Sequence, residues 1–288
     1  MLRAYFDTNV YDAIEKGNLH GEDVEAIRVA LKRREIVAPL SLSDIEELLG
    51  QWDTDRPATI RRLRVAGDLV GFDGILKQPS DLLRDAIQAY VAGTAAPSPL
   101  LPRQDRRILA TYLSRLVRGY VSHADELTKV VAAVHLNKER FGNVMLEGRD
   151  QTLAEWKTLH PENPAVTFAE YFASGADRWA EDFAVPLGLA QACRDLGLKG
   201  LLEVRPVRLA VGALMSLVFS QIIGDGPQQR QPAWSDYYDL WHALTASVAD
   251  VFVTFDERLA GSLARVPVDG FRVVTSLRAL LDDPTLAR

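Results

Sequence analysis

The sequence predicts an α/β protein in which a parallel sheet flanked by helices is interrupted by a large, all-helical insertion. Short apolar strands alternate with helical segments near both ends of the chain, a pattern typical of βαβ units. Between the two ends, apolar residues recur mainly at helical spacing. We therefore expect residues 1–52 and 232–288 to form one discontinuous domain, with residues 53–231 as a mainly helical insertion.

Each predicted element follows from apolar spacing and from the residues that begin or end helices and turns. The first part should contain strand 2–6, helix 10–17, helix 23–34, strand 35–39 and a helix capped by Ser41 or Ser43. The insertion should contain one short strand, 68–72, and helices 82–92, 106–134, 167–184, 187–196 and 207–223, with linkers at 95–102 and 224–232. The last part should contain helix 236–248, strand 251–255, helix 257–266, strand 271–275 and a short final helix.

Composition narrows the class of protein. The chain has 288 residues, of which 48% are hydrophobic and 25% charged, so it can form a sizeable core. Its net charge of −6 argues against binding nucleic acid through bulk charge. Cys193 is the only cysteine, which excludes an intramolecular disulfide and a multi-cysteine zinc site. We expect it to be a small buried residue.

Two features bear on location. Asp7 stands where a signal peptide would need its apolar stretch, so we expect a cytoplasmic protein. The most apolar run, 209–223, is shorter than the roughly 18 residues expected of a membrane span, and it contains polar residues. It is therefore predicted to be a buried core helix, and no membrane partner is expected.

Five aromatic residues of the insertion fall at helical spacing and are predicted to be core: Trp156, Phe168, Tyr171, Phe172 and Trp179.

Four carboxylates come from both ends of the chain. Asp7 and Asp256 follow predicted strands, whereas Glu47 and Asp239 lie on predicted helices. Ligands of open parallel sheets gather outside the carboxyl ends of the strands, so these acids are expected to converge there. Because clustered carboxylates raise one another's pKa, a divalent cation would relieve the conflict, and Mg²⁺ or Mn²⁺ prefers oxygen ligands.

The two ends of the chain resemble a PIN domain, the fold of a family of metal-dependent nucleases. The resemblance rests on Phe6-Asp-Thr-Asn-Val10, the helix with Glu47 and Leu48, and segments 239–246 and 249–259. It implies that Asp7, Glu47, Asp239 and Asp256 form the acidic cluster, supported by Asn9 and Thr254. The helical middle has no counterpart in the small members of the family.

The implied activity is phosphodiester hydrolysis by water with Mg²⁺ or Mn²⁺, and RNA is the first choice of substrate over DNA. Asp7 and Asp239 would be the most direct metal ligands, and Asp256 would bind directly or through water. Glu47 would orient or deprotonate the attacking water. The sequence leaves open an antitoxin or inhibitor partner, as in toxin–antitoxin pairs, and a homo-oligomer.

Each acid also has a structural alternative. Asp7 and Asp256 can cap the helices that follow them, and Asp239 can stabilise a helix start. Helix phase decides between Glu46 and Glu47, and between Asp236 and Asp239; spacing favours Glu47 and Asp239. His242 follows Asp239 on the same helix face and is more readily explained as a packed or hydrogen-bonded residue than as a phosphate contact. The other histidines, His20, His123, His135 and His160, lack metal-ligand spacing, which disfavours zinc.

Arginines are the candidates for contact with nucleic acid: Arg61, Arg62, Arg64, Arg106 and Arg107. Such residues usually form solvated helix faces, but near the acids they could guide a phosphate backbone. A competing function is a non-catalytic PIN-like scaffold that binds RNA or protein through the insertion. A phosphohydrolase of the haloacid dehalogenase type is poorly supported, because Asn9 stands where that family needs its second aspartate.

Overall fold

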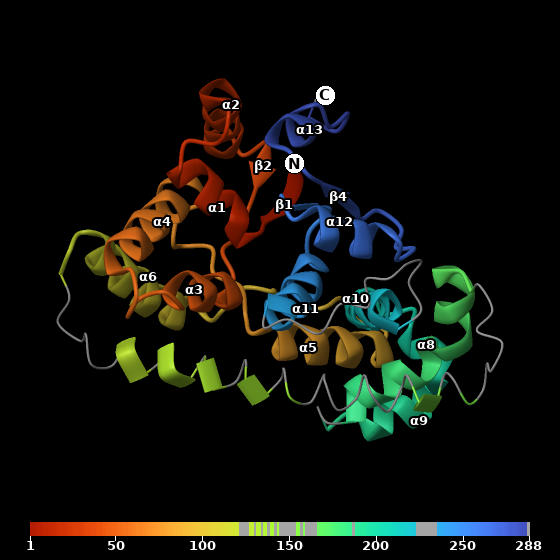
Figure 1. Cartoon of the computed structure of the whole chain (residues 1–288). Helices are drawn as coiled ribbons and strands as arrows, with labels where there is room; N and C mark the ends of the chain where they lie inside the picture. Colours follow the sequence, from red (N-terminus) through yellow and green to blue (C-terminus); the bar gives the residue numbers. More distant parts are fainter. Residues whose placement is uncertain are drawn as a thin grey trace.

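The fold is an α/β arrangement around a four-stranded parallel sheet, seen here in a computed structural model (Figure 1). The residues described are 1–120, 127–129, 131–133, 135–136, 139–140, 143, 154–155, 158, 166–185, 188–222 and 235–286. The strands are β1 (Leu2–Phe6), β2 (Ile36–Val37), β3 (Val251–Val253) and β4 (Arg272–Val274), in the order β2-β1-β3-β4. Strands from both ends of the chain therefore pair directly, as predicted.

Strand β1 lies inside the sheet and sends alternate side chains to opposite faces, as its period of two requires. Leu2, Ala4 and Phe6 join the core on one face. Tyr5 joins the core on the other face and stacks on Phe252 of β3, with ring centroids 5.6 Å apart. Full burial of an aromatic side chain contributes about 1.5–3 kcal/mol, so β1 anchors both layers.

Helices cover both faces of the sheet. The first face packs against α1 (Thr8–Glu15), α2 (Gly21–Lys32), α3 (Leu42–Leu49), α4 (Arg56–Leu69), α6 (Arg103–Val117) and α13 (Leu277–Leu281). The second face packs against α10 (Arg205–Ile222), α11 (Ser235–Ala246) and α12 (Glu257–Ala264). Helices α3 and α11 come from distant parts of the sequence, and they contact each other.

Part of the predicted insertion has a hydrophobic core of its own. It is built by α5 (Pro79–Val91), α8 (Phe168–Ala184), α9 (Ala190–Leu201) and α10, and Leu244 of α11 also contributes to it. Tyr171, Phe172 and Cys193 are buried there as predicted, while Phe168 and Trp179 pack against it half-buried. Trp156 lies outside the described residues. Because α4 and α6 share the core of the sheet, the division at residue 53 remains a prediction.

One predicted element is wrong and another is interrupted. Residues 68–72 do not form a strand: α4 continues to Leu69, and Gly71 then ends it with a positive φ of 76°. The helix predicted over 106–134 is interrupted: α6 ends at Val117, Gly119 follows with φ 84°, and the described residues 127–129 and 131–133 are helical again. Both errors come from apolar residues beyond a helix end, where the glycine conformation overrides the spacing pattern.

Helix α10 was predicted over 207–223 as a core helix, and its central residues are buried. Among the described helices, none combines the length and the apolar character that crossing a bilayer needs.

Candidate active site

Asp7 lies at the carboxyl end of β1, where it is 4% exposed. It stands at the N-cap position of α1 but makes no side-chain capping bond, so the alternative that it is a helix cap is wrong. Its Oδ2 accepts hydrogen bonds from Thr254 Oγ1 at 2.6 Å and from Asn9 Nδ2 at 2.7 Å. The Asn9 amide also donates to Thr254 Oγ1 at 3.0 Å, so the two predicted supports hold each other as well as Asp7.

Glu47 and His242 complete a compact group with Asp7. His242 Nε2 lies 2.9 Å from Oε2 of Glu47 and 3.5 Å from Oδ1 of Asp7. Thr8 donates its hydroxyl to the same Glu47 oxygen at 2.5 Å. One ligand atom from each of Asp7, Glu47 and His242 lies within 4.8 Å of the others, a spacing that could hold a metal ion. The three residues come from β1, α3 and α11, and hence from both ends of the chain.

His242 is the positively charged member of this group. Burial alone lowers the pKa of a histidine, but the neighbouring Asp7, Glu47 and Asp44 raise the pKa of His242 to about 10. Burial raises the pKa of Asp7, an effect that the His242 charge opposes. At neutral pH His242 is thus a cation that compensates the buried carboxylates.

A second layer fixes the orientation of His242. Nδ1 of His242 lies 2.7 Å from the Tyr5 hydroxyl, which donates to Asp44 Oδ1 at 2.9 Å. Asp44 also belongs to a capping box, in which Ser41 Oγ accepts from the Asp44 amide and Asp44 accepts from the Ser41 amide. Burial raises the pKa of Asp44 to about 7 against the opposing effect of His242. Thus Ser41 is the cap that the sequence left undecided between two serines, and the helix start orients the histidine.

The raised pKa of His242 predicts that the protein loses stability in mild alkali. The folded protein keeps this proton up to about pH 10, whereas an unfolded histidine releases it near its ordinary value of 6.5. The contribution of His242 to the free energy of unfolding is therefore fully present below its pKa in the unfolded protein. It is lost as the pH rises through its pKa in the folded protein. Urea denaturation should show the free energy of unfolding falling by up to about 1.4 kcal/mol per pH unit between about pH 7 and pH 10. A slope that is the same in His242→Gln would contradict this assignment.

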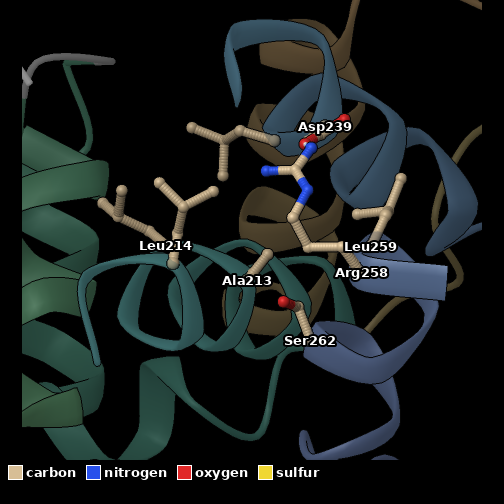
Figure 2. A pocket seen from close by; sticks show the side chains of 8 residues that line it. Ala213, Leu214, Asp239, Arg258, Leu259 and Ser262 are labelled. Atoms are coloured by element: carbon tan, nitrogen blue, oxygen red, sulfur yellow. Dashed lines mark hydrogen bonds and ion pairs between the residues drawn. The ribbon is translucent and has the colours of Figure 1, made fainter. Parts of the chain in front are cut away.

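Asp239 and Asp256 do not belong to the group of Asp7, Glu47 and His242, because both lie against Arg258. Arg258 Nη2 makes an ion pair with Asp239 and lies 3.5 Å from Oδ2 of Asp256. Figure 2 shows the guanidinium directed at the Asp239 carboxylate, with Ala213 and Leu214 of α10 lining the same pocket. Asp256 also caps α12, accepting from the amides of Arg258 and Leu259, as its structural alternative predicted.

The two parts of the site are joined through Thr254. Its hydroxyl donates to Asp7 and accepts from the Asp256 amide at 3.1 Å. The four predicted acids are thus gathered around the ends of β1 and β3, but in two pairs. One pair is compensated by His242 and the other by Arg258.

Helix phase turns Glu47 toward Thr8 and His242, and Glu46 on the same helix is partly buried, which raises its pKa. The side chain of Asp236 lies outside the described residues, as do His123 and His160. The sequence did not single out Thr8, Asp44 or Arg258. The signals for them were the hydroxyl beside Asp7, the acid three residues after Ser41 and the basic residue two positions after Asp256.

The predicted basic residues have different surroundings. Arg62 lines a pocket together with Glu47. Arg61 pairs with Glu15, Arg64 donates to the Val117 carbonyl, and Arg106 donates to the Asp73 carbonyl. Arg107 is exposed on α6. Among these five arginines, only Arg62 lines the pocket beside the acids.

No protein-family model, no curated protein and no solved structure matches this chain.

Proposed function

We propose that this chain is a metal-dependent phosphodiester hydrolase with a PIN-like fold, acting as an endoribonuclease. In this proposal, residues 1–52 and 232–288 form the nuclease domain, and residues 53–231 are an insertion that contacts substrate or partner. The observation that carries it is the convergence of Asp7, Glu47 and His242 beside the carboxyl ends of parallel strands from both chain ends.

The residues present fit a divalent cation. Asp7 and Glu47 offer carboxylate oxygens, which Mg²⁺ and Mn²⁺ prefer, and these lie within 4.8 Å of each other and of His242. Asp7 and Glu47 would hold the ion, and His242 would balance their charge while it is protonated. When bound, the ion would polarise the scissile phosphate and lower the pKa of a water molecule. Asp239 and Asp256 would bind the ion only if Arg258 moved away from them to another partner.

The protein's own groups account for the remaining chemistry. Thr254 and Asn9 fix the Asp7 carboxylate from one side, leaving its Oδ1 toward His242. The Glu47 side chain is 31% exposed and lines a pocket, so a water molecule can reach it. We assign Glu47 as the group that accepts the proton when the water oxygen forms a bond to phosphorus. The P–O bond to the leaving nucleoside then breaks, the leaving oxygen takes up a proton from solvent water, and Glu47 returns its proton to solvent.

Removing divalent cations should abolish the activity. The test is a cleavage assay on single-stranded RNA, structured RNA and DNA with Mg²⁺ or Mn²⁺, compared with the same reactions in chelator. We expect cleavage of RNA with the cation and none in chelator, because the two carboxylates alone have no means of polarising a phosphate. Cleavage that continues in chelator would contradict the proposal.

One observation favours a second candidate, a non-catalytic scaffold. His242 and Arg258 already compensate the four acids with the protein's own cations. Such a protein would bind RNA or a partner without cutting it. Binding without cleavage of any of the three substrates, with either cation, would favour this function over the hydrolase.

A further inference from the structure

A pocket of about 310 Å³ opens beside Glu47, between α1, α3 and α4. It is lined by Thr8, Asn9, Asp12, Lys16, Glu47, Leu48, Gln51 and Arg62. Thr8 and Glu47 belong to the candidate active site, so the pocket continues directly from it. Its volume is at the lower end of the roughly 300–1,000 Å³ of ligand sites, which suits a small polar group rather than a folded element.

The wall of this pocket formed by α1 and α4 carries two cations for one carboxylate. Asp12 lies 2.6 Å from Lys16 Nζ and 3.2 Å from Arg62 Nε. Arg62 Nη2 donates to Gln51 Oε1 at 2.7 Å. Although Asp12 Oδ1 forms an ion pair with it, the buried Nε of Arg62 makes no hydrogen bond among the described residues. Asp12 thus contacts each of the two cations with one carboxylate oxygen, but it offers a single negative charge to both.

Arg62 is also held in place more firmly than its neighbours. Its side chain is only 13% exposed, whereas that of Arg61 is 53% exposed. A guanidinium already ordered by packing loses little side-chain entropy when it binds, and its planar fork matches the oxygens of a phosphate. Lys16, 54% exposed, can move toward the same ligand as a second charge.

We propose that the pocket lined by Arg62 and Lys16 binds a backbone phosphate of a single-stranded nucleic acid, next to the phosphate that is cleaved. The inference rests on the proposed function and adds to it the part of the substrate that is recognised. A bound phosphate would replace Asp12 as the partner of Lys16 and Arg62. The nucleic-acid strand would then run past Thr8 and Glu47. Because only backbone is read, RNA and DNA should both bind here.

Arg61 supplies a matched control. It is adjacent in sequence and carries the same charge, but it pairs with Glu15 and does not line the pocket. Bulk electrostatic attraction would respond equally to the loss of either arginine. Of these two arginines, only the loss of Arg62 would weaken binding at a built phosphate site.

The test is fluorescence anisotropy of labelled oligouridine and oligothymidine in chelator, where no cleavage occurs. Arg62→Gln should weaken binding of both by about tenfold and reduce the salt slope by about one. Lys16→Gln should weaken binding by about threefold, and Arg61→Gln by less than twofold. Circular dichroism establishes that each variant is folded, and Lys16→Gln tests the site independently if Arg62→Gln does not fold.

Equal weakening by Arg61→Gln and Arg62→Gln would overturn the inference, as would weakening on RNA alone, since both polymers carry the same phosphates. Wild-type protein that binds neither oligonucleotide would also overturn it. Asp7→Asn separates the two proposals, because it should bind in chelator like wild type and yet fail to cleave with Mn²⁺. Cleavage by wild type together with unchanged binding by Arg62→Gln would leave the hydrolase standing and remove only the phosphate site.

Discussion

Asp7→Asn should lower the cleavage rate by at least about a hundredfold while leaving the protein folded. Losing even an indirect partner of a metal site costs 10–100-fold, and Asp7 is proposed as a direct ligand. The asparagine carbonyl can still accept from Thr254 and Asn9, so these two hydrogen bonds are kept, whereas the bond from the Thr8 hydroxyl to the other oxygen is lost. The negative charge beside Glu47 and His242 is lost. Initial cleavage rates on RNA with Mn²⁺ measure the effect, and calorimetric titration with Mn²⁺ measures the loss of binding directly.

Asp105→Asn is a suitable control, because Asp105 is exposed in the first turn of α6. The same change in charge at this position should leave both cleavage and Mn²⁺ binding unchanged. If Asp7→Asn cleaves RNA as fast as wild type, Asp7 has no part in the mechanism. Reduced cleavage in both variants would point to net charge rather than to the site.

Strands β1 and β3 of the central sheet could be predicted because they are short, apolar and followed by acids. Leu2–Phe6 and Val251–Val253 were found within a residue or two, and their parallel pairing follows from helices on either side. Helix α4 could not be predicted in the same way. Arg56–Leu69 contains several arginines and a proline, and it is held by Asp55 as its cap and by Leu63 in the core.

The site was predictable where backbone position decides it and not where side-chain pairing decides it. Asp7 directly follows β1 and therefore lies at the carboxyl end of that strand. The phase of α3 places Glu47 on the side facing Thr8, next to Asp7. The association of Arg258 with Asp239 and Asp256 depends on how α11 and α12 pack together. Predicting the position of His242 would have required knowing that Tyr5 of β1 points into the core and faces α11. These pairings are set by how distant elements pack together, which the local sequence does not specify.

The network around His242 shows how one charged residue can organise a buried site. His242 contacts Glu47 and Asp7 through one ring nitrogen and Tyr5 through the other. Each carboxylate is costly to bury alone, and the imidazolium compensates more than one of them. The same residue thereby links the candidate metal ligands to the capping box of α3 through the Tyr5 hydroxyl.

His242→Gln should lower the free energy of unfolding by about 3–5 kcal/mol at neutral pH, because it leaves buried acids without their cation. Glutamine retains hydrogen-bonding groups but has no charge. His20→Gln is the control, since His20 is exposed before α2, and its effect should stay within about 0.5 kcal/mol. Urea denaturation followed by circular dichroism measures both variants.

A double variant separates charge compensation from simple loss of packing. If uncompensated charge causes the instability, adding Glu47→Gln to His242→Gln should restore part of the lost free energy, because one of the carboxylates that faced His242 is then neutral. If lost packing is the cause, the second substitution should add a further loss, since the Thr8 hydrogen bond to Glu47 would also be weakened. The sign of the coupling energy thus decides whether His242 acts in this site as a charge or as a filler of space.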